Sequence, residues 1–587
     1  MVSKPLSTSA LLLAGSLALG VASAARAGDA EDSPYSPPKQ MTVSPLGVDL
    51  QSGKFSYSAT DLSIGPLTLE RSYLGGQPIY GNAHFGPNWT HNHSIYAYQK
   101  DTLDKLGNTL VVIGGKTYSF NRTATSASWD GPSAEGTFLE GQDGAFVFTD
   151  QQGNVYTFDK NVPAIPADKI QAGWPNQRIG RIDYANGHTI TYTYNGAKQL
   201  TQIASNYGYS IQFGYAGATS SITSACGYND AVGGPTLCVS YSYGAPNSSN
   251  LASVLDLAGQ RWGYDYASDI QLTCVRKVNS SDCLIRNEYV AGMRPRWVMK
   301  QTAADGGVWT YRYDAPDPDY DLNASHGLRE TTGAGYTDPE GSSVWAEFYS
   351  GQLKKYYVNG RIDDPAWNGA DSRVTELEYY GLELAKLIHK EGNSVSYARR
   401  GELVLSETWT PKPGSGLAPV FTASQYPDRG PDGNSNQCDP SVGRKRCNKP
   451  IWTEDFNRNR TQYSYDPSHG GVLTETGPAV NNVSPQKRYS YVQRTARLAN
   501  GAAAGGPIWL VDRIAFCRDG NPSGNGCALG PGDEVVTSFD YGPATGPSNL
   551  NLHSETVTAN GVSRRTCYGY DGQGDKISTT RPNGLCQ

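Results

Sequence analysis

Hydrophobic and polar residues alternate at every second position in many short segments of the chain. The clearest segment is Thr189–Tyr194, whose two tyrosines fall on one face and whose threonines fall on the other. This period of two is typical of a half-buried β-strand. Asn186-Gly187 precedes the segment and Asn195-Gly196 follows it, and both dipeptides favour tight turns. Residues 180–203 are therefore predicted to form a strand, a tight turn and a second strand.

The same pattern recurs along the chain. Each copy combines a turn signal with alternating aromatic residues, and the copies fall at residues 154–159, 259–266, 305–314, 391–397, 457–466 and 564–571. One such hairpin is only half apolar and cannot bury its face alone, so neighbouring hairpins must continue the sheet. We predict an all-β fold, an extended array of antiparallel β-hairpins with no helix longer than a turn or two.

Some segments between the copies differ in character. Residues 382–390 have helical propensity, but the segment is short and we expect a strand. Gly, Pro, Ser, Asn or Ala dominate 411–416, 428–436 and 500–507, which are predicted to be loops or insertions.

The composition supports this fold class and excludes others. The 587 residues include 67 Gly and 35 Pro, which disfavours long helices, and 38% hydrophobic residues with 18% charged ones exclude a disordered chain. Tyr outnumbers Phe by 38 to 13, which favours β-surfaces with one wet side. A net charge of −6 gives no electrostatic sign of nucleic-acid or anionic-membrane binding.

The N-terminus has the three parts of a secretory signal. Lys4 supplies the charged start, residues 10–21 form an apolar run, and 22–24 and 25–27 each match an A-x-A cleavage site. The apolar run is too short for a membrane anchor, and no second run follows. We expect a signal peptide at 1–27 and a linker at 28–40. The mature protein should have no membrane span and should lie in the cell envelope or outside the cell.

The ten cysteines agree with an exported protein. They form neighbouring couples in the sequence, and such couples in an oxidising compartment predict local disulfides. No C-x-x-C motif suggests zinc or redox chemistry. The predicted pairs are Cys226/Cys238, Cys274/Cys283, Cys438/Cys447, Cys517/Cys527 and Cys567/Cys586.

Two parts of the chain resemble the Rhs/YD-repeat family. Residues 180–200 spell G-R-x(n)-N-G-x(3)-T-Y-x-Y-N-x(4)-L, which is similar to the family's repeat. Residues 42–73 and 85–92 look like the domain that opens many such proteins, although Asn88 stands where the family usually has glycine. The resemblance implies an Rhs-type N-terminal β-domain at 41–150 and a YD-repeat array with loop insertions at 151–587.

For this family the resemblance implies a sheet that spirals into a hollow shell. In bacterial toxin systems such a shell encloses a C-terminal toxin that is cut free after a D-P-x-G-L motif, and related animal proteins use a similar shell for adhesion. This chain has one D-P-x-G, at 338–341, followed by Ser342 and not Leu, so we expect a repeat turn there. We expect an incomplete, shell-like sheet without the cleavage core or toxin.

Three clusters were weighed as metal sites. His91 and His93 would share a face of a strand and His84 is near, but no fourth ligand is evident and packing roles are favoured. Asp317, Asp319 and Asp321 with Asn323 alternate like a calcium loop, but they lack the Gly and distal Glu of an EF-hand. Asp455, Asn457 and Asn459 are better explained as the repeat's own turn.

Searches for catalytic motifs give nothing. The chain has no G-x-S-x-G elbow, its Gly-rich stretches lack the Lys-Ser/Thr of a phosphate loop, and Arg444-Lys445-Arg446 falls within a predicted disulfide loop. We therefore predict no catalytic residues, no cofactor and no metal, and we expect a protein that is not an enzyme. An exported propeller or β-helix enzyme is disfavoured because the repeat period is uneven.

Two functions follow from these observations. The first is a secreted, non-catalytic Rhs/YD-repeat scaffold, either the N-terminal part of a toxin-enclosing and delivery shell or a truncated orphan of one, with a toxin or a downstream Rhs polypeptide as partner. The second is a stand-alone surface protein that binds glycans or neighbouring cells. An exposed sheet edge would also permit self-association. The tryptophans that could stack on sugars are Trp129, Trp174, Trp262, Trp309, Trp345, Trp409, Trp452 and Trp509.

Overall fold

The computed structural model describes residues 39–75, 84–100, 108–113, 116–122, 128–130, 137–140, 144–150, 152–164, 176–216, 221–244, 246, 248–267, 271–291, 297–314, 332–349, 351–359, 373–381, 383–400, 403–427, 443–547 and 549–580. The predicted signal peptide at 1–27 and most of the linker at 28–40 lie outside these residues. The division predicted at residue 150 falls between two paired strands and stays a prediction.

Nearly all regular structure in the described residues is β. Two four-residue helices, α1 (Lys39–Thr42) and α2 (Arg444–Cys447), and one 3₁₀ turn, η2 (Pro531–Asp533), accompany the strands. This confirms the predicted all-β class without long helices. The ambiguous segment 382–390 is the strand β27 (Glu383–His389), as expected.

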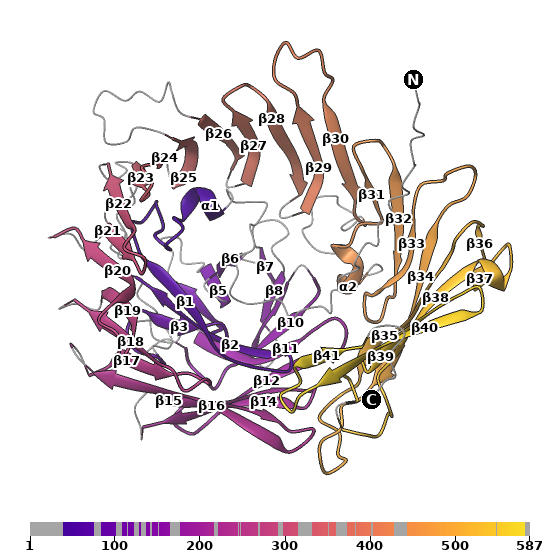
Figure 1. Cartoon of the computed structure of the whole chain (residues 1–587), viewed down its shortest axis with the longest axis horizontal. Helices are drawn as coiled ribbons and strands as arrows, with labels where there is room; N and C mark the ends of the chain where they lie inside the picture. Colours follow the sequence, from indigo (N-terminus) through magenta and orange to yellow (C-terminus); the bar gives the residue numbers. More distant parts are fainter. Residues whose placement is uncertain are drawn as a thin grey trace, which may run out of the picture.

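Three strands form a separate inner sheet, β1 (Ser56–Ile64), β2 (Leu67–Leu74) and β3 (Trp89–His91), paired antiparallel in that order. β1 packs against β14 (Tyr209–Tyr215), β15 (Ile222–Asn229) and β16 (Gly234–Gly244) of the main sheet. Figure 1 shows this small sheet inside the curve of the larger one.

The main sheet is one long antiparallel array in which each strand pairs with the next along the chain. Its first strands are β4 (Tyr96–Lys100), β5 (Asn108–Ile113), β6 (Lys116–Arg122), β7 (Ser128–Asp130), β8 (Thr137–Glu140), β9 (Phe146–Thr149), β10 (Val155–Asp159), β11 (Asn176–Asp183), β12 (Thr189–Tyr194) and β13 (Leu200–Ser205). After β14–β16 it continues through β17 (Asn250–Leu255), β18 (Arg261–Tyr266), β19 (Leu272–Lys277), β20 (Cys283–Tyr289), β21 (Val298–Ala303), β22 (Val308–Tyr313), β23 (Gly333–Thr337), β24 (Ser343–Tyr349), β25 (Gln352–Val358) and β26 (Arg373–Tyr380).

The later strands follow the same rule. They are β27, β28 (Ser394–Arg400), β29 (Leu403–Thr410), β30 (Val420–Gln425), β31 (Trp452–Glu454), β32 (Arg460–Tyr465), β33 (Val472–Thr476), β34 (Gln486–Arg494), β35 (Ile508–Cys517), β38 (Glu534–Asp540), β39 (Ser554–Ala559), β40 (Val562–Tyr570) and β41 (Lys576–Thr579). A small hairpin, β36 (Pro522–Ser523) with β37 (Gly526–Cys527), stands apart from the array. The predicted antiparallel hairpin array is thus confirmed.

Strand β11 is a fork in the pairing. Its residues 178–183 pair with β10, while on the other side 176–178 pair with β4 and 181–183 pair with β12. The strands from β4 to β11 consequently form a closed circuit of pairings, and the array leaves this circuit at β12. At the other end, among the described pairings, β41 pairs with β40 alone, so the long sheet is open.

The array curls until its end reaches its beginning, but turns and loops make the contact and strands do not. The Trp509 backbone N–H donates to the Asn186 carbonyl oxygen at 2.8 Å, and the Ala499 N–H donates to that of Asp230 at 3.1 Å. The Asn229 side-chain amide donates to the Gly572 carbonyl at 2.9 Å. We call this contact between the turns of β11–β16 and residues 499–509 and 572–573 the seam. Figure 1 shows β39 and β41 beside β11, β12 and β14.

A regular defect explains the curl. At most repeats the strand register shifts immediately before the second tyrosine of the Tyr-x-Tyr pattern, as between Thr193 and Tyr194 or between Ser464 and Tyr465. Such a β-bulge bends its strand and increases the local twist. The register shifts at the corresponding points of β14, β16, β18, β20, β26, β34 and β40. Repeated bends of one hand turn a flat ribbon into a curled one.

The tyrosine hydroxyl at that second position closes eleven of the described hairpins, whereas at β28 the Arg399 side chain donates in its place, to the Leu384 carbonyl. The tyrosine hydroxyl donates to a backbone carbonyl near the beginning of the preceding strand, at distances between 2.6 and 3.0 Å. We call these residues the closing tyrosines: Tyr194, Tyr215, Tyr243, Tyr266, Tyr289, Tyr313, Tyr379, Tyr465, Tyr491, Tyr541 and Tyr570. The tyrosine excess in the composition therefore has a structural cause, since Phe lacks the donor.

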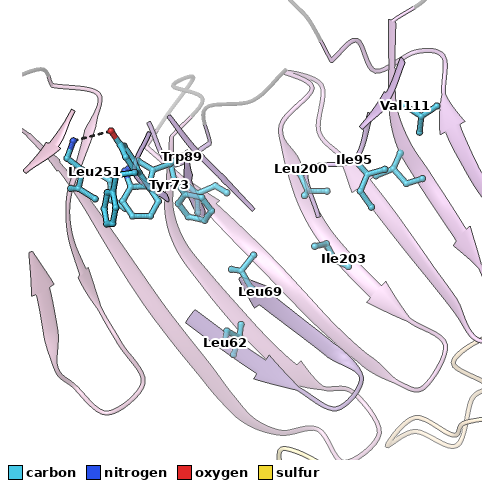
Figure 2. Close-up of a cluster of buried hydrophobic side chains, with 14 of the residues drawn as sticks. Leu62, Leu69, Tyr73, Trp89, Ile95, Val111, Leu200, Ile203 and Leu251 are labelled. Atoms are coloured by element: carbon cyan, nitrogen blue, oxygen red, sulfur yellow. Dashed lines mark hydrogen bonds between the residues drawn. The ribbon is translucent and has the colours of Figure 1, made fainter. Parts of the chain in front are cut away.

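The main core lies between the inner sheet and the first half of the array. Figure 2 shows Tyr73 and Trp89 of the inner sheet beside Leu251 of β17, with Leu62 and Leu69 over the neighbouring strands. All five side chains are buried. The prediction that neighbouring hairpins continue the sheet is met by the array, and the inner sheet adds a covering layer that was not predicted.

Candidate functional site: the inner face of the curled sheet

The first tyrosine of the repeat pattern marks the inner face of the array. Tyr264 of β18 packs against Trp89 of the inner sheet, with ring centroids 5.1 Å apart, and Tyr192 of β12 contacts His93. Side chains two residues apart on a strand share a face, so the closing tyrosines project to the same side. The inner face is therefore lined by aromatic rings at every repeat.

A buried ion pair anchors the inner sheet to this face. Arg71 of β2 donates two hydrogen bonds to Asp61 of β1, Nε–Oδ2 at 2.9 Å and Nη2–Oδ1 at 3.0 Å. Arg71 also donates to the Tyr264 hydroxyl at 2.9 Å, and the Tyr241 hydroxyl donates to Asp61 at 2.9 Å. Both charges are almost fully buried, with side-chain exposures of 1% and 4%. Buried charges need such partners, because leaving one unpaired is strongly destabilising.

Aromatic contacts surround this pair. The Arg71 guanidinium lies 4.5 Å from the ring centroid of Trp89, and the Trp89 indole N–H donates to the Tyr266 hydroxyl at 2.8 Å. The Tyr73 hydroxyl accepts the backbone N–H of Leu272 at 3.0 Å. Trp89, which the sequence placed beside the histidines, is thus a packing and hydrogen-bonding residue, as expected.

The histidine cluster does not have the geometry of the metal site that was weighed. β3 ends at His91, so His93 lies beyond the strand and does not share its face. His93 uses both ring nitrogens in hydrogen bonds, Nδ1 with the Tyr192 hydroxyl at 3.0 Å and Nε2 with the Thr68 carbonyl at 2.9 Å. His91 packs edge-on to Phe85 and lies 5.6 Å from His84, centroid to centroid. Burial lowers the pKa of His93 to about 4 and that of His91 well below its ordinary value.

In the second half of the array the described residues leave the inner face partly uncovered. Tyr264, beneath the inner sheet, is 4% exposed, and Tyr311, whose hydroxyl contacts Ser44, is 8% exposed, whereas the equivalent Tyr463 and Tyr489 are only half-buried. Cations lie over tyrosine rings in this half: Lys354 Nζ is 4.6 Å from the Tyr379 centroid, Arg399 Cζ is 4.5 Å from that of Tyr397, and Lys449 Nζ is 5.5 Å from that of Tyr465. We call residues 373–494 of this face the open inner face.

Of the other two candidate metal sites, one lies outside the described residues and the other is a turn. Asp317, Asp319, Asp321 and Asn323 lie outside the described residues. Asp455 Oδ1 accepts the backbone N–H groups of Asn457 at 2.8 Å and Asn459 at 2.9 Å, which confirms the predicted repeat turn. Asp338-Pro339-Glu340-Gly341 is also a turn, with Ser342 N–H donating to Asp338 Oδ1 at 2.7 Å.

Three of the five predicted disulfides are formed: Cys226–Cys238, Cys274–Cys283 and Cys517–Cys527. Cys438 and Cys586, the predicted partners of Cys447 and Cys567, lie outside the described residues, so these two pairs stay predictions. In the described part of the chain, the one group of three potential metal ligands is Cys517, Cys527 and Asp533. Its two sulfurs are bonded to each other, and Asp533 accepts the N–H groups of Asp519 and Gly520.

Among tryptophans whose side chains the structure describes, Trp409 alone is exposed, at 46%. Trp345 is buried, and Trp262, Trp309, Trp452 and Trp509 are half-buried. Trp174 and the side chain of Trp129 lie outside the described residues. Trp409 ends β29 and meets Phe456 edge-on, with centroids 6.1 Å apart. No helix among the described residues is long and apolar enough to cross a bilayer.

Sequence reasoning missed the Arg71–Asp61 pair. Arg71 lies on the same buried face of β2 as the apolar Leu67, Leu69 and Tyr73, at every second position. A charged residue in an apolar series of this period was a usable signal. The partner could not be read from the sequence, because Asp61 sits beside a register shift between Thr60 and Leu62 that breaks the simple alternation of β1.

Comparisons with known proteins add limited information. The chain matches no protein-family model and no curated protein. A TcdB2–TccC3–Cdc42 structure is similar over 88% of this chain and 26% of that chain, at 10% identity and a TM-score of 0.36. A TcdB2–TccC3 structure is similar over 92% of this chain and 30% of that chain, at 10% identity and a TM-score of 0.33. The N-terminal domain of effector protein SpvB from Salmonella typhimurium is similar over 38% of this chain and 98% of that chain, at 11% identity and a TM-score of 0.19.

The chain thus spans less than a third of the two TcdB2–TccC3 chains. TM-scores below 0.5 do not establish a shared fold, and the architecture described above rests on the strand pairings of this chain alone.

Proposed function

We propose that this protein is an exported, non-catalytic scaffold of the Rhs/YD-repeat type, whose curled sheet forms part of a shell around another polypeptide. The observation that carries the proposal is the open inner face. A scaffold that only needed to be stable would cover its aromatic residues, as the inner sheet does for the first half of the array. The repeat pattern and the opening-domain motifs support the same reading.

The chemistry of the open inner face suits an extended polypeptide. Half-buried tyrosines offer stacking surface and hydroxyl groups, and the cations above them pair with carboxylates or aromatic rings. The partner we propose is a toxin or a downstream Rhs polypeptide, held inside the curve and shielded from proteases.

Protease protection tests this proposal. The exported chain would be produced with the polypeptide encoded next to it, and the fraction of that polypeptide resisting protease would be measured. Tyr463→Glu with Tyr489→Glu, on the open inner face, should lower the protected fraction at least about fivefold, a change of about 1 kcal/mol in retention. Gln462→Glu with Ser490→Glu, on the exposed outer side of the same strands, should leave it unchanged.

If the neighbouring polypeptide is digested equally with and without this chain, the shell proposal is wrong. Equal loss in the inner and outer variants would also contradict it, because that result would place the contact elsewhere.

A second function, surface binding of glycans, is favoured by one observation, the exposure of Trp409. An exposed indole stacks on the apolar face of a sugar ring. Glycan-array binding that Trp409→Ala abolishes would support it. Tyr380→Ala is the matched control, since Tyr380 is 83% exposed on the neighbouring part of the array. An array without signal for the unaltered protein would rule this function out.

A further inference from the structure

We infer that His84, His91 and His93 form an acid-sensitive latch between the inner sheet and the array. The latch holds the inner sheet against the array at neutral pH and releases it on acidification. The inference goes beyond the scaffold function, because it concerns how the inner sheet is held against the array and not which partner the protein binds.

The latch is built where two elements meet. His93 follows β3 and bridges Thr68 of the inner sheet to Tyr192 of β12 in the array. His91 ends β3 and is buried against Phe85 and against Phe213 of β14. No described residue hydrogen-bonds either ring nitrogen of His91. The three histidines 84, 91 and 93 are buried together at this contact.

The hydrogen bonds of His93 fix the tautomer of its neutral ring. A carbonyl oxygen can only accept, so Nε2 must carry its proton toward Thr68. Nδ1 is then the acceptor in neutral imidazole, and the Tyr192 hydroxyl donates to it. Protonation turns Nδ1 into a donor, and the Tyr192 hydroxyl must turn over and become the acceptor. What opposes protonation is therefore burial of the charge, which is most severe at His91, where no described residue hydrogen-bonds either ring nitrogen.

The charged groups around the latch oppose protonation. Arg178 of β11 and the neighbouring His84 and His93 all disfavour a positive charge on His91, in addition to burial. Arg71 is the cross-strand neighbour of His91. Of the carboxylates on these elements, Asp61 already accepts two hydrogen bonds from Arg71 and one from Tyr241, and Asp183 of β11 pairs with Arg181. Glu70 of β2 lies on the face of the strand opposite Arg71. The tyrosines facing the site, Tyr192 and Tyr215, are neutral and their pKa values are raised by burial.

The sign of the pH effect follows from these lowered pKa values. Above about pH 6.5 the histidines are neutral whether the sheet is docked or released, and docking is unaffected. As the pH falls from about 6.5 toward 4, the released state takes up protons that the docked state refuses. Docking is therefore weakened progressively through this window.

Hydrogen exchange at a series of pH values tests the latch in the full chain. Amides of β1–β3 should lose protection at a higher pH than amides of β32–β34, which have no contact with the latch. His91→Phe combined with His93→Gln cannot take up the protons, and should move the midpoint for β1–β3 down by at least one pH unit. His553→Gln, at an exposed histidine, should leave the midpoint unchanged.

If the double variant loses protection at the same pH as the unaltered protein, groups other than these histidines control release and the latch is refuted. Simultaneous loss of protection in β1–β3 and β32–β34 would also refute it, because that is global unfolding. His93→Gln alone keeps a donor and an acceptor, so it provides a folded variant should His91→Phe be poorly produced.

Discussion

At the residue scale, single side chains repeat the same local task along the whole array. In the turns that begin at Asn195, Asp256, Asp338, Asp455 and Asp571 the Asp or Asn side chain accepts backbone N–H groups, and the fourth residue takes a positive φ. That residue is glycine at Gly259 (φ 75°), Gly341 (φ 84°) and Gly574 (φ 89°), but it is lysine at Lys198 (φ 63°) and arginine at Arg458 (φ 66°). Residues with a Cβ are strained in this conformation.

Lys198→Gly should therefore stabilise the protein by about 0.5–1 kcal/mol, because relief of the left-handed strain exceeds the added entropy of the unfolded chain. Urea unfolding would measure the change. Arg458→Gly serves as the comparison and should gain less, since Arg458 also pairs with Glu454 at 3.2 Å and lies over the Phe421 ring. Equal or opposite changes would mean that backbone strain is not the controlling term.

At the element scale, the hairpin is closed by a hydrogen bond that the sequence pattern does not announce. The pattern placed the strands, the turns and the repeated tyrosines correctly, because a period of two and Asn-Gly or Asp-Gly signals are local properties. It could not show that the second tyrosine reaches a carbonyl some 15 residues earlier, as Tyr266 reaches Leu251, because that contact joins two strands whose register the local pattern does not set.

Two adjacent tyrosines on β26 differ in their surroundings, because one closes a hairpin and the other is exposed to solvent. The Tyr379 hydroxyl donates to the Leu353 carbonyl at 2.8 Å, while Tyr380 is 83% exposed. Tyr379→Phe should lower the free energy of unfolding by about 1 kcal/mol, the usual loss for one internal hydrogen bond. Tyr380→Phe should change it by less than about 0.5 kcal/mol. Denaturant unfolding of both variants provides the measurement, and equal effects would show that the closing tyrosines do not stabilise the hairpins.

At the scale of the whole molecule, the sequence predicted an open, curled array but not how its parts meet. The resemblance indicated an N-terminal β-domain at 41–150, yet the site of the inner sheet against the array was not visible, since contacting residues such as Arg71 and Tyr264 are 193 positions apart. The spacing of the histidines raised a metal site as an alternative to the favoured packing roles, and the end of β3 at His91 does not give the shared strand face that this alternative needed. The fork at β11 and the seam likewise depend on contacts between distant residues.

The seam can be tested at one glycine. Gly187 has a φ of 88°, and a Cβ there would lie 2.6 Å from the Pro507 carbonyl oxygen across the seam. Gly187→Ala should cost about 1 kcal/mol for the backbone and a further 1–2 kcal/mol for the clash. Gly259→Ala, with a φ of 75° and open space around it, should cost the first amount only. Thermal or urea unfolding distinguishes them, and equal costs would mean that the seam yields without resistance.

The seam and the fork give the molecule two very different ends under mechanical load. A force that pulls β41 away from the array acts across one rung at a time, because among the described pairings β41 is held by β40 alone, and β40 and then β39 become the edge strand in turn. Hydrogen bonds loaded in this peeling direction break singly, and the backbone contacts of the seam are few. Peeling meets a different arrangement at β11, where three partners, β10, β4 and β12, hold one strand. The strands of the array therefore separate one after another from β41 at low force, and this separation stops at the closed circuit of strands β4–β11.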